Sequence, residues 1–326
     1  MSKYKIIEEF EKLCEFYKKD SSKRFQLKAI HESLSIIKQY APLHLYSGEE
    51  FAKLMKEKNI KGIGKGTIDR INEILQTHSL KELNVENEKN EIMSLFKTIT
   101  GVGDKRAEEW YQAGYQTISD ISQAISEKKL SSTHHIDLGL KYYEDLKERI
   151  PRDEIDKMKK KIKKIVKKIN KDLIFEICGS YRRGEETSGD MDLLFTNPHD
   201  PSNSSYLKEI VEKLTEEKIL IDHLTEKGDK KYMGFCKFKQ SSNYKVRRID
   251  IRYFPYDEYW AGILYFTGNK EFNISLRNRA LEKGYSLNEY GLTHVKTNEK
   301  KKIESENHIF EILEIPYKSP LERRMK

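Results

Sequence analysis

The chain has 326 residues, which is long enough for two or more domains with a sizeable core. Charged residues make up 35% of it and the net charge is +8, a balance that favours a polyanionic partner, although a Lys-rich proteome gives the same numbers. No apolar run is long enough to cross a membrane, which argues against a membrane protein. The three cysteines, Cys14, Cys178 and Cys236, lack metal-ligand spacing, so we expect reduced, buried thiols and no zinc site.

The first half of the chain is predicted to be helical and contains an internal repeat. The pattern Gly-apolar-Gly occurs at Gly62-Ile63-Gly64 and again at Gly101-Val102-Gly103, each time before a predicted helix. Such a hairpin turns backbone amides outward at a helix N-terminus, where they can bind DNA phosphate without reading sequence. A single copy is equally typical of a simple helix-helix turn, whereas two copies favour nonspecific DNA binding.

The most informative stretch runs from Gly179 to Asp192, directly after an apolar segment at residues 173–178. Asp190 and Asp192, two positions apart, lie on the same face of a strand, where they can share a pair of Mg2+ ions. The amides of Gly179 and Ser180 at a helix start can cradle phosphate, and Arg183 adds charge. Each fragment alone is weak, since Asp-x-Asp is common on solvated strand edges. Together they predict a nucleotidyl transferase.

A third carboxylate follows in residues 246–253, whose polar and apolar side chains alternate from Arg248 onward. The alternation places Arg248, Asp250 and Arg252 on one face of a strand and the intervening isoleucines on the other. A simple ion-pair ladder would have the same pattern. We favour Asp250 as a third metal ligand.

Residues 154–170, just after Pro151, are predicted to form a Lys-rich helix that leads into the Gly179 motif. Its apolar residues keep helical spacing, so the lysines are interpreted mainly as a solvated face, with a nuclear-import signal as the second interpretation. Residues 255–326 mix helix with a hairpin that turns at 288–291.

At this point the chain resembles the family X DNA polymerases, the enzymes of the polymerase beta type, over nearly its whole length. The matching segments are the two hairpin motifs, Arg149-Ile150-Pro151-Arg152, residues 179–192, residues 248–252, Tyr265-Phe266-Thr267-Gly268, Arg277, residues 280–284 and the tail from Ile315 to Arg323. The resemblance implies an α+β fold in four parts: a helical lyase-like domain with the first helix-hairpin-helix at 1–83, a second helix-hairpin-helix subdomain at 84–150, a catalytic palm with a mixed β-sheet at 151–256, and a small α/β subdomain for the nascent base pair at 257–326.

The resemblance also implies residue roles. Asp190, Asp192 and Asp250 would be the catalytic and metal-binding residues, for two Mg2+ ions that Mn2+ can replace. The implied nucleotide-binding residues are Arg149, Ser180, Arg183, Gly189, Tyr265, Phe266, Gly268, Lys270 and Asn273. The implied DNA-binding residues are Gly62, Gly64, Lys65, Arg70, Gly101, Gly103, Arg248, Arg277 and Tyr290. Backbone carbonyls of Lys58, Ile60, Ile63, Lys97, Ile99 and Val102 would hold Na+ or K+.

The implied function is that of a monomeric, DNA-directed DNA polymerase that fills short gaps in base-excision-type repair. Its partners would be gapped or nicked double-stranded DNA, deoxynucleoside triphosphates and repair accessory proteins. A nuclear location is expected, with a viral, cytoplasmic or organellar setting left open. Tyr265-Phe266 resembles the pair that rejects ribonucleotides, where template-independent relatives carry Gly-Trp. The alternatives are a template-independent nucleotidyl transferase and an inactive DNA-binding scaffold.

The main departure from the family pattern is Arg70, which stands where lyase-active members carry a nucleophilic lysine. Arginine stays protonated and cannot form a Schiff base, so we do not expect it to support 5'-deoxyribose phosphate lyase activity. We interpret Arg70 as a phosphate-binding side chain, with Lys65 as the nearest substitute amine. Lys270 replaces an acidic family residue, and Gly268-Asn269 falls where the family has a strained, often cis, peptide.

Overall fold

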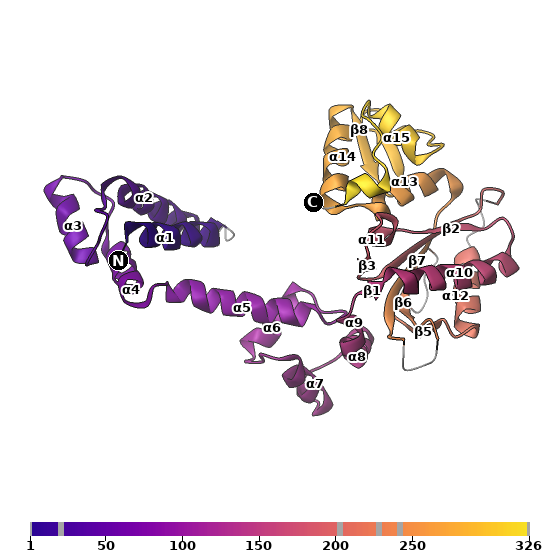
Figure 1. Ribbon diagram of the computed structural model, residues 1–326, viewed down its shortest axis with the longest axis horizontal. Helices are drawn as coiled ribbons and strands as arrows, with labels where there is room; N and C mark the ends of the chain where they lie inside the picture. The colour runs from indigo at the N-terminus through magenta and orange to yellow at the C-terminus, as the bar shows by residue number, and fades with distance from the viewer. Residues whose placement is uncertain (1, 19–22, 201–204, 226–229, 240–243, 325–326) are drawn as a thin grey trace. The chain divides into compact units, whose positions relative to one another are not determined.

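The computed structural model describes residues 2–18, 23–200, 205–225, 230–239 and 244–324 (Figure 1). The chain divides into two compact units, Met1–Ser131 and Ser132–Lys326. The first unit is helical and the second combines helices with a mixed sheet, so the predicted α+β class is confirmed. In the described ranges, no helix combines the length and the apolar composition needed to cross a membrane.

The first unit begins with helices packed around one apolar core. Each helix is amphipathic, so its apolar stripe turns inward and its charged residues stay in water. These helices are α1 (Lys3–Lys18), α2 (Arg24–Tyr40), α3 (Gly48–Glu57) and α4 (Lys65–Thr77). The most deeply buried side chains in this core include Ile6, Phe10, Leu13, Ile37, Phe51, Met55, Ile71 and Ile74.

Three further helices complete the first unit. They are α5 (Lys81–Lys97), α6 (Asp104–Gln112) and α7 (Ile118–Ser126). Phe96 of α5 meets Trp110 of α6 edge to face, with ring centroids 5.7 Å apart, and both rings are buried. A capping box between Thr117 and Asp120 sets the start of α7.

The centre of the second unit is a five-stranded sheet in the order β2-β4-β7-β6-β5. β4 and β7 run parallel, and the other neighbours in the sheet are antiparallel. The strands are β2 (Ile174–Ile177), β4 (Met191–Thr196), β5 (Leu220–His223), β6 (Lys231–Cys236) and β7 (Arg247–Tyr253).

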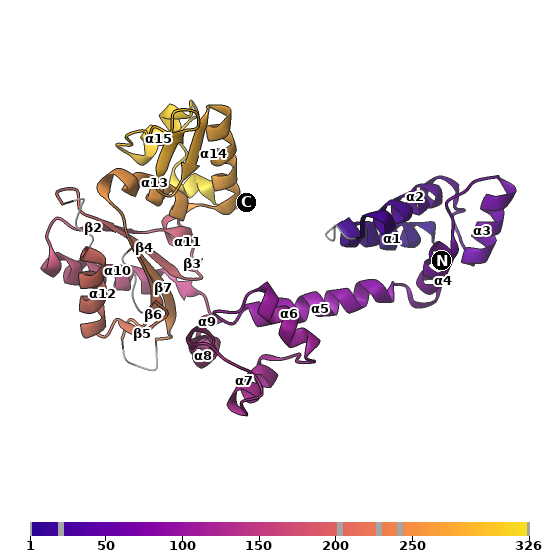
Figure 2. The ribbon, with the colours of Figure 1, turned by 180° about the vertical axis from the view of Figure 1, so that it is seen from behind.

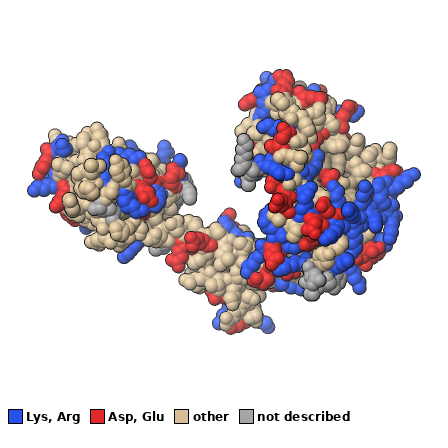
Figure 3. Space-filling view, viewed as in Figure 1, with Lys and Arg blue, Asp and Glu red and all other residues tan. Residues whose placement is uncertain are grey.

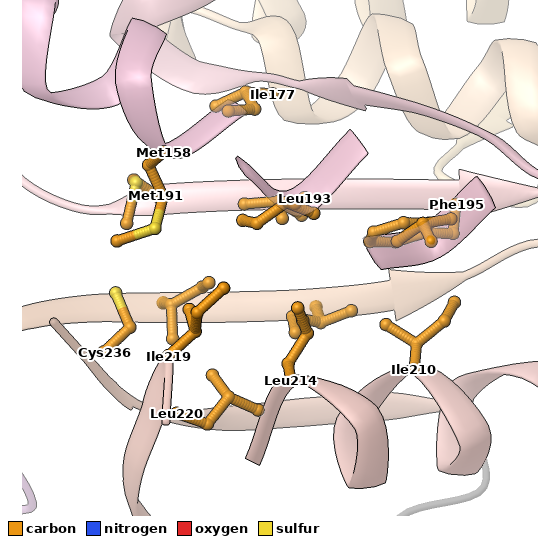
Figure 4. Packing of buried hydrophobic residues seen from close by; sticks show 14 of the residues in the cluster. Met158, Ile177, Met191, Leu193, Phe195, Ile210, Leu214, Ile219, Leu220 and Cys236 are labelled. Atoms are coloured by element: carbon orange, nitrogen blue, oxygen red, sulfur yellow. The ribbon is translucent and has the colours of Figure 1, made fainter. Parts of the chain in front are cut away.

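Helices α10 (Arg152–Ile169) and α12 (Tyr206–Glu216) cover one face of this sheet, as both views of the ribbon show (Figures 1 and 2). The two helices share one buried cluster with alternate residues of the strands. Figure 4 shows Met158 of α10 against Met191 of β4, and Ile210 and Leu214 of α12 in the same cluster. The predicted Lys-rich helix is therefore confirmed as α10, with its apolar face against the sheet.

The end of the chain forms a smaller layer of helices and a hairpin around a second core. Strands β8 (Tyr285–Asn288) and β9 (Gly291–His294) pair as the predicted hairpin, which turns at residues 289 and 290. The helices are α13 (Tyr256–Thr267), α14 (Lys270–Glu282), α15 (Glu306–Ile312) and a 3-10 turn at Pro320–Arg323.

The segment at the start of the second unit forms hydrogen bonds with strands β5 and β7 of the sheet. It contains α8 (His134–Lys141), α9 (Tyr143–Leu146) and β1 (Ile150–Pro151), which pairs with β3 (Thr187–Ser188). The rings of His134 and His135, at the start of α8, donate to the carbonyls of His223 and Leu224, each over 2.7 Å.

Asp222 of β5 accepts from Tyr142 and from Lys141, the latter over 2.7 Å. The buried Arg247 donates to the Glu148 carbonyl over 2.9 Å and pairs with Glu154 over 2.9 Å. Residues 132–150 therefore group with the sheet, whereas the sequence assigned them to the preceding subdomain; the four-part division stays a prediction. All three cysteines are buried and free, as expected.

Candidate active site

The two strand carboxylates lie side by side. Asp192 and Asp250 are partners in the parallel pairing of β4 with β7. On β7, Ile249 and Ile251 are buried on the side of α10, so Arg248, Asp250 and Arg252 face the other way, as the alternation predicted. Asp190 directly precedes β4 and is exposed. The structure thus brings together the carboxylates that the sequence singled out.

Crowding and burial disfavour negative charge at this site. Burial, followed by the Asp190 and Asp250 carboxylates, raises the pKa of Asp192 to about 7. Burial likewise raises the pKa of Asp250, against the lowering effect of Arg248. The Arg248 guanidinium donates to the Asp250 carboxylate over 2.7 Å, and the exposed fraction of each side chain is below one fifth. A bound cation would relieve the repulsion that raises these pKa values.

No group of three His, Cys, Asp or Glu side chains in the described ranges has the arrangement of a formed metal site. The carboxylates of Asp190, Asp192 and Asp250 nevertheless offer oxygen atoms only, which is the ligand set that Mg2+ prefers, and the Asp190 and Asp250 carboxylates add to the effect of burial in raising the pKa of Asp192. The residues therefore fit a hard divalent cation in their chemistry, and Asp190, Asp192 and Asp250 stay the predicted ligands.

A short helix, α11 (Gly179–Arg182), begins beside these carboxylates. The Cys178 amide donates to the Asp192 carbonyl over 2.8 Å, which fixes the start of the helix to β4. Gly179 has φ +60, and a Cβ there would lie 3.3 Å from an Asp192 carboxylate oxygen. The predicted helix start at Gly179-Ser180 is confirmed, and the half-buried Ser180 is its second residue.

Two predicted phosphate-binding arginines flank this helix. The Arg149 guanidinium donates to the hydroxyl and carbonyl of Thr187 over 2.7 and 2.9 Å, and it lies next to Gly189, where a Cβ would be 3.8 Å from it. The Arg183 guanidinium donates to the Thr267 carbonyl over 2.8 Å, and its buried Nε atom has no partner among the described residues. Arg183 is therefore aimed from α11 at the α13–α14 junction.

That junction holds the other predicted nucleotide-binding residues. The peptide bond Gly268-Asn269 is cis, as the family position suggested, and α14 starts directly after it at the exposed Lys270. The Asn273 amide donates to the Tyr265 carbonyl over 2.7 Å. The neighbouring Phe266 ring lies under the Arg252 guanidinium, 4.6 Å from its centroid.

The predicted DNA-contacting residues of this unit lie around the same junction. Arg277 is exposed and lies over the Tyr265 ring, 5.4 Å from its centroid. Tyr290, at the hairpin turn, is 43% exposed, and its ring centroid is 6.2 Å from that of Phe254.

The sequence did not single out the buried ion network behind α11. Arg182 donates to the Thr267 hydroxyl over 2.8 Å and pairs with Glu306 over 2.9 Å. Glu306 also pairs with the fully buried Arg323 over 2.6 Å. Arg324 then donates to the carbonyls of Arg183 and Gly184 over 2.7 and 2.5 Å. The network joins α11, the start of α15 and the 3-10 turn near the end of the chain. Within the Gly179 motif, the basic pair Arg182-Arg183 is the feature that indicates a need for acidic partners.

In the first unit the two hairpins repeat one backbone geometry. Gly62 and Gly101 have φ +117 and +91, and the residues that cap the following helices, Gly64 and Gly103, have nearly identical extended backbones. Among described residues, nothing lies within 4 Å of a Cβ built at Gly64 or Gly103. Both glycines are exposed, so the surface of each turn is open to a ligand, and Lys65 is the first, exposed residue of α4.

The residues proposed for a monovalent cation surround these same turns. In the second hairpin the Val102 amide donates to the Ile99 carbonyl over 3.1 Å, and Lys97 pairs with Asp104 over 2.9 Å. In the first hairpin Lys58 caps the C-terminal end of α3, and the Ile60 amide donates to the Met55 carbonyl over 2.8 Å. The cation sites, including the carbonyl of Ile63, stay predictions.

Arg70 is held by a carboxylate of its own unit. It forms two hydrogen bonds with Glu82, over 2.6 and 3.2 Å, and Tyr17 donates to the same carboxylate over 2.9 Å. Although burial raises the pKa of Glu82, the bonds and charge of Arg70 bring it below its usual range. The sequence did not predict this pairing, which neutralises Arg70; its role in binding DNA phosphate stays a prediction.

Comparisons with known families match most of the chain. A family described as "DNA polymerase beta palm" matches residues 149–256, "DNA polymerase beta thumb" matches 262–324, and "Fingers domain of DNA polymerase lambda" matches 94–147. The chain is 31% identical over 279 residues to a Rattus norvegicus protein named DNA polymerase lambda, covering 81% of this chain and 48% of that protein.

Two other relatives cover similar ground. A DNA polymerase lambda of Arabidopsis thaliana is 31% identical over 341 residues, 98% of this chain and 62% of that protein. A DNA nucleotidylexotransferase of Xenopus laevis is 29% identical over 296 residues, which cover 79% of this chain and 57% of that protein. The chain thus spans between about half and two thirds of the length of the two polymerases it matches. With fingers, palm and thumb matched in this order along one chain, the protein belongs to the family X DNA polymerases.

Proposed function

We propose that the protein is a DNA-directed DNA polymerase that fills short gaps during base-excision-type DNA repair. Its substrates are gapped or nicked duplex DNA and deoxynucleoside triphosphates. It acts as a monomer in the nucleus, alongside repair accessory proteins. The observation that carries the proposal is the pairing of Asp192 with Asp250 beside the start of α11.

Of the residues around that pair, the carboxylates would bind metal and the others would bind the triphosphate. Asp190, Asp192 and Asp250 would hold two Mg2+ ions, or Mn2+ in their place, and the bound ions would neutralise charge that develops on the phosphates. Asp250 or adjacent solvent would accept the proton of the primer 3'-hydroxyl, which attacks the α-phosphate and expels pyrophosphate.

The triphosphate would be held by the elements that surround the carboxylates. The α11 amides with Ser180 would bind its oxygens, and Arg149 and Arg183 would add charge from the two sides. Tyr265 and Phe266 would lie against the sugar, where their bulk favours deoxyribose. Arg248 would contact the primer-terminal phosphate once its partner Asp250 binds metal.

The two hairpins of the first unit would bind DNA on either side of the gap. The exposed, uncrowded glycines Gly64 and Gly103 at the helix starts support this, and Na+ or K+ held by the hairpin carbonyls would bridge to phosphate. We propose no lyase activity for Arg70, because a guanidinium paired with Glu82 offers no free amine.

The test is primer extension on a one-nucleotide gap with single alanine replacements of Asp190, Asp192 and Asp250. Each should lower extension by more than about 100-fold, or roughly 3 kcal/mol of transition-state stabilisation, while DNA binding stays close to normal. Extension that survives in Asp250→Ala would refute its role. Efficient addition to a single-stranded primer without template would favour the transferase alternative, in line with the exotransferase relative. A wild-type protein that extends no primer would be a binding scaffold.

A further inference from the structure

Most of the excess positive charge of this chain lies in one helix. Residues 152–169, which form α10, contain nine basic and three acidic side chains, a net charge of +6, against +8 for the whole chain. The rest of the protein, including the candidate active site, is therefore almost neutral overall. A requirement to bind DNA at the active site does not explain why the charge gathers here.

The lysines of this segment lie on the outer side of α10. Lys157, Lys160, Lys163, Lys164, Lys167 and Lys168, which we call the α10 lysine face, are all exposed. Figure 3 shows Lys and Arg gathered over the part of the molecule where Figure 1 draws α10. Lys161 and Lys239 both lie over the Phe238 ring, 5.9 and 5.6 Å from its centroid, so the basic surface continues onto the end of β6.

Much of this charge is not neutralised within the protein. Lys157 pairs with Asp153 over 2.9 Å, but Lys160, Lys163, Lys164 and Lys168 form no ion pair or hydrogen bond with any residue that the structure describes. Lys160, Lys164 and Lys168 follow one another at four-residue intervals, about 6 Å apart along the helix axis. These three like charges, with Lys163 beside them, repel one another, and an external polyanion would relieve that repulsion.

The α10 lysine face and the candidate active site lie on opposite sides of the sheet. Met191 and Leu193 of β4 pack toward α10, so the intervening Asp192 points away from it. A duplex whose primer end reaches Asp192 and Asp250 would thus be separated from this face by the sheet and by α10 itself. The face is a second site, apart from the one that the proposed reaction uses.

The chemistry of the face favours the phosphate backbone of nucleic acid. The apolar residues of α10, Ile155 and Ile162 among them, are buried in the core, so the helix has no apolar side to insert into a bilayer. Between its lysines the face carries no aromatic or apolar anchor of the kind that concentrates binding energy in protein interfaces. A straight row of unpaired ammonium groups instead suits the regular charge of a duplex.

We propose that the α10 lysine face binds the backbone of a second DNA duplex, independently of sequence and of the primer end at the active site. This goes beyond the proposed function, which needs only one duplex. Binding would proceed through release of counterions from about four phosphates, so it should weaken steeply as salt rises. The protein could then hold two DNA segments at once.

The test compares two full-length variants with equal loss of charge. One replaces Lys160, Lys163, Lys164 and Lys168 by Gln, and the control replaces the exposed thumb lysines Lys296, Lys301, Lys302 and Lys318 by Gln. Each protein is immobilised, loaded with one molar equivalent of unlabelled gapped DNA, and offered a labelled blunt duplex at about 100 mM salt, a range in which backbone contacts still bind.

The wild type and the control should capture the labelled duplex, and the α10 variant should capture it at least about tenfold more weakly. Its slope of log Kd against log salt should fall by about 3 to 4, since each lost phosphate contact removes about 0.9. Equal capture by the two variants would overturn the proposal. So would wild-type binding to phosphatidylserine vesicles or polyglutamate without binding to the duplex.

Gap filling by the same variants separates this inference from the proposed function. The α10 variant should extend a primer on one-nucleotide gaps at the wild-type rate, because none of its replaced lysines lies on the carboxylate side of the sheet. Capture of the labelled duplex by a wild type that cannot extend a primer would overturn the proposed function and leave the second DNA site standing.

Discussion

Asp192 and Asp250 are direct partners across two parallel strands, and burial, followed by the carboxylates of Asp190 and Asp250, raises the pKa of Asp192 to about 7. The ordinary value for aspartate is 3.8. A charged Asp192 at neutral pH therefore lowers the free energy of unfolding of the folded protein. Strongly shifted pKa values of this kind cluster at functional sites.

Replacement of Asp192 by Asn should stabilise the metal-free protein at pH 8. Between the unfolded pKa and about 7 the folded state binds more protons at this site, so the free energy of unfolding falls as pH rises, by at most about 1.4 kcal/mol per pH unit. Asp192→Asn should flatten that fall. Urea unfolding in EDTA from pH 5 to 8 measures it, with the exposed Asp257→Asn as control. An unchanged pH slope in Asp192→Asn would contradict the raised pKa.

Replacement of Glu306 by Gln should destabilise the second unit strongly. Glu306 is 4% exposed and pairs with both Arg182 and Arg323, so the change leaves two guanidinium groups without their carboxylate. The expected loss is about 3 to 5 kcal/mol, measured by urea unfolding. The exposed Glu304 provides the matched control, and Glu304→Gln should change stability by less than about 0.5 kcal/mol. A similar small change in both variants would mean that water replaces the lost pairs.

Arg324 should help to position α11 for the incoming nucleotide. Its guanidinium holds the Arg183 and Gly184 carbonyls at the end of that helix. Arg324→Ala should raise the KM for deoxynucleotide about fivefold, the equivalent of about 1 kcal/mol, with little change in kcat. Arg324→Lys keeps one donor group and should recover part of the effect. Steady-state kinetics on gapped DNA checks both, and an unchanged KM in the alanine variant would exclude this role.

Restoring a lysine at position 70 should give only weak lyase activity while Glu82 remains. A lysine there would lie beside the Glu82 carboxylate, which holds it in the protonated form that cannot attack a sugar aldehyde. Borohydride trapping on a 5'-deoxyribose phosphate gap should show a faint adduct with Arg70→Lys and a stronger one with Arg70→Lys/Glu82→Gln. The wild type should give none; a strong adduct with the wild type would point to another amine, first to Lys65.

Local patterns predicted the elements of the site better than its contacts. The alternation around Asp250 predicted the correct face of β7, because a strand's side chains follow a period that the sequence displays. The pairing of Asp192 with Asp250 depends on strand register across the sheet, and no local pattern encodes that. The contact of Glu82 with Tyr17 likewise joins residues far apart in the chain, and no local pattern predicts it.

The attachment of residues 132–150 to the sheet has a practical consequence for recombinant fragments. A fragment that begins at Pro151 would lack the Glu148 carbonyl, which accepts from the buried Arg247. It would also lack the rings of His134 and His135, which bind the carbonyls at the end of β5. An orphaned buried donor alone costs about 1 to 3 kcal/mol, enough to compromise soluble expression. An isolated catalytic module for crystallisation or isotope labelling should therefore begin at Ser132, where the compact unit itself begins.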